Sequence, residues 1–291
     1  MIKSYLSLIK FSHTIFAMPF AVIGFFLGAT AVAPLSPWRG SGGEARLFAL
    51  VLLCMIFARS AAMAFNRWAD YKYDKENART KIREIPSGII SEGNALAFVI
   101  ANGVLFVSVT FFINRICFYL SPVALLVVLG YSFTKRFTPL CHLILGLGLS
   151  LAPIGAFLAV TGEFRLLPLL YSFVVLFWVS GFDIIYALQD EEFDSAHNLK
   201  SIPVMLGKSN ALVFSRALHA IAGCIVLYAG YAARFDLWYW IGAAIFISLL
   251  IYQHTLVKPN DLNKVNLAFF TTNGIASVVF AVFFLLEIFL K

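Results

Sequence analysis

Two short segments of the chain concentrate carboxylates at spacings suited to binding a metal ion. Of the fifteen acidic residues, ten lie in residues 66–93 and 183–194. In the first segment Asn66, Asp70 and Asp74 recur every four residues, a spacing that places them on one face of a continuous helix. The second segment has a matching face, formed by Asp183, Tyr186, Asp190 and Asp194.

Stacked carboxylates need a positive partner. Like charges one helical turn apart destabilise a helix by roughly 0.2–0.5 kcal/mol per pair, and the repulsion is stronger at a membrane interface, where the dielectric constant is lower. Two such faces on separate helices could converge on Mg²⁺, which takes carboxylate and amide oxygens and shares its shell with substrate phosphates. The spacing therefore favours a metal-bridged diphosphate over the alternative, in which the acids only solvate helix ends and pair with nearby Lys and Arg.

Basic residues close to these acids are candidate diphosphate ligands. Arg binds phosphate oxygens as a bidentate fork and Lys binds them as a point charge. The candidates in the loops are Arg67, Lys72, Arg79, Lys81, Arg83 and Lys200. Each also serves as a charge that orients the chain in a membrane. Tyr131 and Lys135, one turn apart, present a phenol and an ammonium on one face; the alternative is an interfacial aromatic anchor with a snorkelling lysine.

Two further charges lie inside strongly apolar segments. Arg59 precedes Asn66 by about two helical turns on the acidic face, and an Arg within a membrane costs at least about 2.5–3.5 kcal/mol on insertion scales. We expect it to bind a polar group of a second substrate or to neutralise Asp70. Asp183 lies deeper than Asp190 and is expected to support the site or to face that second substrate. The histidines are dispersed and predict no metal site.

The composition defines the elements that must position these residues. The chain has 291 residues, of which 61% are hydrophobic and 13% charged, about half the charge of a typical soluble protein. This excludes a disordered chain, a disulfide-stapled secreted domain and a nucleic-acid-binding module. Nine apolar runs are long enough to span a bilayer: 12–33, 45–65, 94–113, 116–134, 141–161, 166–187, 209–230, 237–256 and 267–288.

We therefore predict an all-α membrane protein with about nine transmembrane helices around a central cavity that opens to the cytoplasmic side. No hydrophilic stretch is long enough for a separate domain, so residues 1–291 are expected to form one domain. Fourteen basic residues, Lys10 among them, fall on one predicted side and six, including Arg39, on the other. The positive-inside rule then places the amino terminus in the cytoplasm, in a multi-pass protein of the cell inner (plasma) membrane.

The two acidic segments also form a faint internal repeat. Asp70 and Asp190 are 120 residues apart, as are Asp74 and Asp194. Residues 83–86 are echoed by residues 200–203 at a slightly shorter offset. Repeat-related halves often meet at a central site in membrane proteins, so each half is expected to supply an acidic helix end and a basic loop to one cavity.

At these residues the chain resembles the UbiA superfamily of intramembrane aromatic prenyltransferases. Its NxxxDxxxD motif is matched by Asn66, Asp70 and Asp74, and its second DxxxD motif by Asp190 and Asp194. The YxxxK element is matched at 131–135. The loop RTxxRPxPSG is matched at 79–88, where Glu84 stands in place of a common proline. Within the family the chain is most similar to 4-hydroxybenzoate polyprenyltransferase-like proteins, including those of the futalosine route to menaquinone.

The resemblance implies Mg²⁺-dependent transfer of a polyprenyl group from polyprenyl diphosphate to an aromatic acceptor such as 4-hydroxybenzoate, in quinone biosynthesis. It implies metal ligation by Asn66, Asp70, Asp74, Asp190 and Asp194, and catalytic roles for these aspartates with Tyr131 and Lys135. The lipid bilayer would supply the prenyl substrate through a lateral opening. Other acceptors stay open, namely a dihydroxynaphthoate, a haem or a glycerol-phosphate lipid. A cation transporter is the alternative class, although its acids would lie nearer the bilayer midplane.

Overall fold

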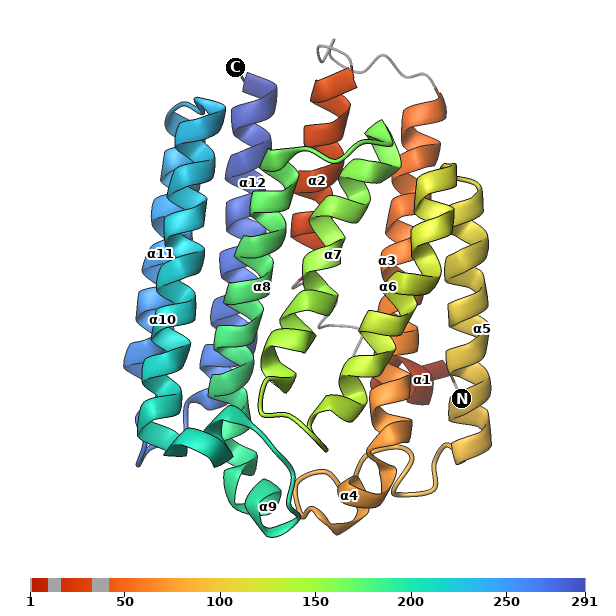
Figure 1. Cartoon of the computed structure of the whole chain (residues 1–291), viewed down its shortest axis with the longest axis vertical. Coiled ribbons are helices and arrows are strands. Elements are labelled where there is room, and N and C mark those ends of the chain that lie inside the picture. The colour runs from red at the N-terminus through yellow and green to blue at the C-terminus, as the bar shows by residue number, and fades with distance from the viewer. Residues whose placement is uncertain (1, 10–16, 33–41, 291) are drawn as a thin grey trace.

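The computed structural model of the chain is a bundle of long helices, capped at one end by short ones (Figure 1). It describes residues 2–9, 17–32 and 42–290. The start of the predicted span 12–33, Lys10 and Arg39 lie outside the described residues. Within the described ranges β-pairing is limited to one isolated bridge. The all-α class is confirmed.

The long helices follow the apolar runs of the sequence. In the part of the chain that the structure describes, eight are long and apolar enough to cross a membrane. They are α3 (Gly42–Ala69), α5 (Glu92–Phe111), α6 (Arg115–Thr134), α7 (Cys141–Thr161), α8 (Leu166–Ala187), α10 (Ile202–Ala233), α11 (Leu237–Leu256) and α12 (Asn273–Leu290). A further apolar helix, α2 (Met18–Val32), has 15 residues, fewer than a perpendicular span requires.

Three short helices complete the order. α1 (Ile2–Leu8) begins the chain, α4 (Tyr71–Glu76) follows α3, and α9 (Glu191–Ala196) follows α8 after the 3₁₀ turn η2 (Leu188–Asp190). Figure 1 shows α4 and α9 at the same end of the bundle, opposite the end at which α12 finishes. The fold therefore brings the two acidic segments, 120 residues apart in sequence, to one end.

Polar caps fix where several helices begin. The side chains of Ser91, Asn114 and Ser201 each accept a hydrogen bond from a backbone N–H in the first turn of α5, α6 and α10. Such a cap contributes about 1 kcal/mol to helix stability. Asn114 also donates from its amide to the carbonyl of Leu158 in α7, at 2.8 Å. Asn114 thereby ties the turn between α5 and α6 to the next helix.

Close helix contacts hold α7 and α8 against the rest of the bundle. A Cβ on Gly24 of α2 would lie 2.0 Å from the carbonyl oxygen of Pro153 in α7, so only glycine permits this approach. On α8, Trp178 is fully buried and its Nε1 donates to Asn273 of α12 at 2.9 Å. α7 and α8 are therefore placed rigidly, and the chemistry-bearing residues of both lie toward the end that carries α4 and α9.

A π-helical turn, η3 (Leu267–Thr272), precedes α12. The side-chain amide of Asn273 donates hydrogen bonds to two backbone carbonyls of this turn, those of Ala268 at 2.9 Å and Phe269 at 3.0 Å. Such turns occur mostly as local insertions in α-helices and are frequent at functional sites. Here the turn sets the ring of Phe269 4.3 Å from that of Tyr186.

Candidate active site

Both acidic segments break their helices at the first aspartate of the motif. Asp70 has φ −92° and ψ 8°, and Asp190 has φ −104° and ψ 1°, in the bridge region of backbone space where many active-site residues lie. The continuous helix expected over 66–74 is therefore interrupted. The backbone N–H of Asp74 still donates to the carbonyl of Asp70 at 2.8 Å, so the one-turn spacing of the side chains is kept.

A polar cavity of about 220 Å³ lies between the two segments. Most of the residues singled out from the sequence line it. They are Asn66, Asp70, Asp74, Arg79, Arg83, Tyr131, Lys135, Asp183, Tyr186, Asp190 and Asp194. The structure thus brings both acidic faces, the YxxxK element and two loop arginines around one space.

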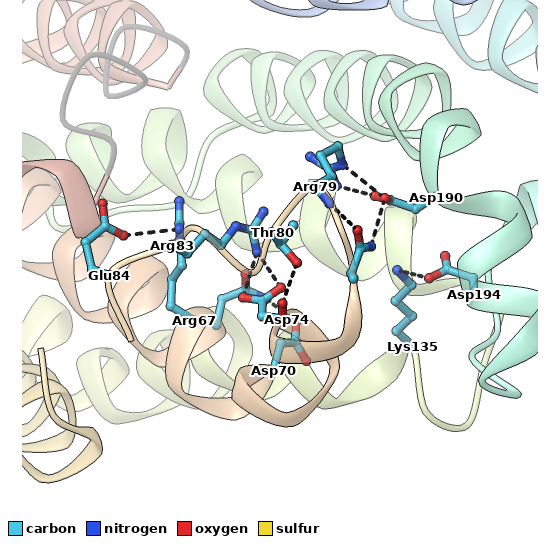
Figure 2. Close-up of polar contacts among 12 residues, drawn as sticks. Arg67, Asp70, Asp74, Arg79, Thr80, Arg83, Glu84, Lys135, Asp190 and Asp194 are labelled. Atoms are coloured by element: carbon cyan, nitrogen blue, oxygen red, sulfur yellow. Dashed lines mark hydrogen bonds and ion pairs between the residues drawn. The ribbon is translucent and has the colours of Figure 1, made fainter. Parts of the chain in front are cut away.

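Ion pairs neutralise the second aspartate of each motif (Figure 2). Asp74 is buried, and both of its oxygens lie 2.8 Å from Nη1 of Arg83. Asp194 is fully buried, and its Oδ1 lies 2.7 Å from Nζ of Lys135. Because each carboxylate is removed from water, these cations stabilise charges that would otherwise be costly.

Arg79 crosses from the first segment to the second. Its Nε and Nη2 donate to the two oxygens of Asp190 at 3.1 and 2.5 Å, a bidentate arrangement (Figure 2). Its Nη1 donates to the hydroxyl of Tyr186 at 2.9 Å. The ring of Tyr186 rests in turn on Phe269 of η3. The π-helical turn therefore supports the arginine that joins the two motifs.

Of the four motif aspartates, Asp70 is the least well neutralised. Its Oδ2 accepts a hydrogen bond from Asn66 at 3.2 Å, and Arg136 is 3.7 Å from its Oδ1. Burial and the neighbouring Asp74 carboxylate raise the pKa of Asp70 to about 6, against the opposing effect of Lys135, Arg136 and Arg83. A further cation beside Asp70 would relieve this cost.

The donor set suits a hard cation, but the acids are not gathered into a closed cage. No three His, Cys, Asp or Glu side chains in the described part of the chain come together in a metal-binding cluster. The carboxylates of Asp74, Asp190 and Asp194 face arginine or lysine instead. Carboxylate and amide oxygens are the ligands that Mg²⁺ prefers, and Asp70, beside the Asp74 carboxylate, has its nearest ion-pair partner, Arg136, only at 3.7 Å. The residues present therefore fit Mg²⁺ in type.

A second cavity, of about 410 Å³, continues from the first into the bundle. Its lining is almost entirely apolar and comes mainly from α3, α5, α6 and α7. Tyr131 and Leu145 line both cavities. Arg59 is the charged residue in the described lining, and its Nε atom is buried without a hydrogen-bond partner. An orphaned buried donor of this kind is costly and is expected to meet a ligand.

Two predicted substrate contacts lie elsewhere. Arg67 is 4% exposed, and its Nη1 lies 3.4 Å from Glu84, outside the lining of the polar cavity. Glu84 also accepts a hydrogen bond from Ser7 of α1, so the residue that replaces proline in the loop anchors the amino-terminal helix. Lys200 contributes a backbone N–H to the carbonyl of Lys135 at 2.7 Å and does not line the cavity. Direct contact of either side chain with substrate stays a prediction.

The structure adds cavity residues that the sequence reasoning did not select. Arg136, which follows Lys135, lines the polar cavity. Asn77 donates to Asp190 at 3.5 Å, and its position three residues after Asp74 was a usable signal. His142 lies 2.6 Å from Asp183. A histidine in the first turn of an apolar helix is unusual enough to have indicated it.

The bundle, the paired acidic helix ends and the adjoining apolar cavity together define an intramembrane prenyltransferase. Residues 17–275 match the model of the UbiA prenyltransferase family. The chain belongs to this family and is an enzyme that transfers prenyl groups.

Named relatives and solved structures agree with this assignment. A 4-hydroxybenzoate octaprenyltransferase of Nitrosomonas eutropha is 29% identical over 84% of this chain and 86% of its own. One of Alcanivorax borkumensis is 30% identical over 77% and 78%. The apo structure of a UbiA homolog from Aeropyrum pernix K1 aligns with a TM-score of 0.82 at 29% identity, over 94% of this chain and 98% of that one. A UbiA homolog from Archaeoglobus fulgidus bound to GPP and Mg²⁺ aligns with a TM-score of 0.71 at 23% identity, over 98% and 99%, which shows the fold.

Proposed function

We propose that this protein transfers a polyprenyl group from polyprenyl diphosphate to an aromatic acceptor such as 4-hydroxybenzoate, with Mg²⁺. The observation that carries the proposal is the junction of the two cavities at Tyr131 and Leu145. A prenyl diphosphate has a charged head and a long apolar tail. The polar cavity suits the head, the apolar cavity suits the tail, and the bond that breaks lies where they meet.

The head group would be held by metal and by the loop cations. Mg²⁺ bound by Asn66, Asp70, Asp74, Asp190 and Asp194 would neutralise the charge that develops on the leaving diphosphate. Arg79, Arg83 and Lys135 already face these carboxylates. When metal and diphosphate enter, these three side chains are free to turn from the acids to phosphate oxygens, where their charge assists departure of the diphosphate.

The acceptor would enter on the Arg59 side. An aromatic carboxylate supplies the oxygen that the buried Nε atom of Arg59 lacks, and a guanidinium binds a carboxylate in a bidentate manner. The apolar lining excludes the water that would otherwise quench an allylic cation. Arg59 and the lining thus favour transfer to an aromatic acid over hydrolysis.

The direct test is an acceptor panel. Purified protein in lipid nanodiscs is supplied with Mg²⁺, a long-chain prenyl diphosphate and, in turn, 4-hydroxybenzoate, a dihydroxynaphthoate and a glycerol-phosphate lipid. We expect prenylated aromatic product that depends on Mg²⁺ and is lost on chelation. Product only from the lipid acceptor would reassign the substrate, and no product from any of them would refute the proposal.

The same proposal places the protein in the inner (plasma) membrane as one domain, residues 1–291, with the amino terminus and the polar cavity on the cytoplasmic side. The supporting feature is the gathering of basic residues at the end that carries α4 and α9. With nine spans the carboxyl terminus would face the opposite side. An alkaline phosphatase fusion at the carboxyl terminus should then be active in bacteria, whereas a fluorescent GFP fusion there would contradict the orientation.

A further inference from the structure

A buried histidine–aspartate pair lies in the polar cavity apart from the ion pairs already described. His142, in the first turn of α7, places its Nδ1 2.6 Å from Oδ2 of Asp183 on α8. The side chain of His142 is 4% exposed and that of Asp183 is 21% exposed, and both line the cavity. Asp183 is thus the more accessible of the two to a bound molecule.

The second ring nitrogen of His142 determines which way the pair is polarised. Nε2 faces the backbone N–H of Ile202 at 3.4 Å. A backbone N–H can only donate, so Nε2 acts as the acceptor and the ring proton resides on Nδ1. His142 therefore donates to Asp183, which orients the carboxylate.

Asp183 differs from three of the motif aspartates in its partner. Asp74, Asp190 and Asp194 each face an arginine or a lysine within 4 Å. For Asp183 the described part of the chain records His142 and no arginine or lysine. A diphosphate would be drawn to the arginines and lysine beside the motif aspartates, and its metal to the motif carboxylates, so Asp183 is left for a neutral hydrogen-bond donor.

Asp183 lies near the junction of the two cavities, where the prenyl group would be transferred. Leu145, one turn beyond His142, lines both cavities, and so does Tyr131. Arg59 lines the apolar cavity and Asp183 lines the polar cavity, on either side of this junction. An aromatic acid with its carboxylate on Arg59 would therefore direct its opposite edge past Tyr131 toward Asp183.

We propose that Asp183, oriented by His142, accepts a hydrogen bond from the ring hydroxyl of the aromatic acceptor. This rests on the proposed function and names the residue that binds the hydroxyl of the acceptor, at the opposite end of the ring from its carboxylate. A hydroxyl that donates to a carboxylate becomes a stronger electron donor to its ring, so the carbon beside it attacks the allylic carbon more readily as the bond from that carbon to the diphosphate breaks. The attacked ring carbon then loses its proton to the departed diphosphate, which restores the aromatic ring. Asp183 contacts the substrate, and His142 is a positioning residue.

The test compares acceptors with and without the donor, using full-length protein in nanodiscs. Initial rates are measured with 4-hydroxybenzoate and with 4-methoxybenzoate, which lacks the hydroxyl proton. We expect the wild-type protein to prefer the hydroxyl compound. His142→Leu should lower kcat/KM for 4-hydroxybenzoate by roughly tenfold to a hundredfold, as for loss of a hydrogen bond to a charged group, and leave the KM for prenyl diphosphate within about twofold.

Rescue separates positioning from general structural damage. His142→Asn keeps an N–H donor near the place of Nδ1 and should recover most of the preference for the hydroxyl compound, whereas His142→Leu should not. Asp183→Ala should lower activity at least as much as His142→Leu, and adding His142→Leu to it should have little further effect. His254→Gln is the matched control, because His254 belongs to another buried histidine pair and lines neither cavity.

The outcomes are distinct. If the wild-type protein prenylates neither aromatic acid, the proposed function fails and this inference fails with it. If the wild-type protein prenylates 4-hydroxybenzoate but His142→Leu and Asp183→Ala keep the full preference over 4-methoxybenzoate, the inference alone is overturned. An equal preference for 4-hydroxybenzoate over 4-methoxybenzoate in His142→Leu and His142→Asn would also overturn it.

Discussion

Residues 66–83, the first acidic segment up to its last basic residue, and residues 183–200, the second extended to Lys200, place their carboxylates alike but balance them differently. The first contains six basic and three acidic side chains, a formal net of +3, and the second contains one basic and five acidic, a formal net of −4. Asp74 is paired within its own segment by Arg83. Asp190 and Asp194 depend on Arg79 from the other segment and on Lys135 from the end of α6.

This difference shows that the two halves have kept the position of their acids but not the source of their cations. Neither segment is neutral alone, and the charge of the site is balanced only when both are assembled. The first segment therefore supplies a cation, Arg79, that pairs with a carboxylate of the second. Four experiments test whether the second segment depends on the first in this way.

The largest effect is expected from removing one carboxylate in either segment. Asp74→Asn and Asp190→Asn should each lower kcat by at least about 10²-fold, because both are proposed to hold Mg²⁺ at the leaving diphosphate. Product formation at saturating Mg²⁺ measures this. Glu192→Gln is the matched control, since this neighbouring carboxylate is strongly exposed and pairs only loosely, at 3.6 Å, with Lys208. An active Asp190→Asn protein would show that the second segment does not hold the metal.

Removing the cation that crosses between segments should have the next largest effect. Arg79→Gln is expected to raise the KM for prenyl diphosphate roughly tenfold, because a bidentate guanidinium is lost from the head-group cavity. Arg79→Lys should recover only part of this, because a lysine cannot form the fork. The KM for the aromatic acceptor should barely change. A pure loss of kcat at unchanged KM would place Arg79 outside diphosphate binding.

Lys135→Met tests the dependence of the second segment on α6. Burial opposes ionisation of Lys135, but the Asp194 carboxylate outweighs it and raises the pKa of Lys135, so the pair is ionic. Lys135 is one-third exposed, so loss of its charge should lower the free energy of unfolding by less than the full penalty for breaking a buried pair. The expected loss is about 1–3 kcal/mol. Thermal unfolding in detergent measures the change.

The double variant Lys135→Met/Asp194→Asn provides the control for that experiment, because it removes the uncompensated carboxylate as well. It should be more stable than Lys135→Met alone. Equal melting temperatures for the two proteins would mean that the Asp194 carboxylate left unpaired by Lys135→Met does not destabilise the fold.

The smallest effect is expected where the two segments touch at the surface. Nε2 of His197 lies 3.0 Å from Oε2 of Glu76, in an exposed contact between α9 and α4. Exposed pairs contribute little, so Glu76→Gln should leave the transfer rate within about twofold. A larger loss would show that the α4–α9 contact, and not the buried ion pairs, aligns the two segments.

The sequence predicted the elements and the acidic positions well because both follow local rules. Apolar runs specify the long helices, and the four-residue spacing specifies that Asn66, in the last turn of α3, and Asp70, just after it, lie on one face. The all-α membrane class and the family resemblance are confirmed. The roles of the individual site residues stay predictions.

The pairing of charges could not be read from the sequence, because it depends on which loops meet. Arg67 and Arg83 are both plausible ligands by composition, but Arg67 turns to Glu84 and Arg83 to Asp74. The helix break at Asp70 was also not visible, since nothing in the sequence around it is a helix breaker such as Pro or Gly. His142 acquires a partner only when α7 packs on α8.

The π-helical turn at 267–272 carries a consequence for insertions and deletions. A π-turn holds one residue more than an α-turn, so deleting a single residue within it would restore a regular helix without breaking the chain. Each residue of an α-helix advances the side chains by about 100°, and the upstream part of the helix would rotate by that amount. Phe269 would then no longer pack against the ring of Tyr186. Deleting one residue would thus remove the aromatic contact that supports Tyr186 and, through its hydroxyl, Arg79, with the helix itself kept.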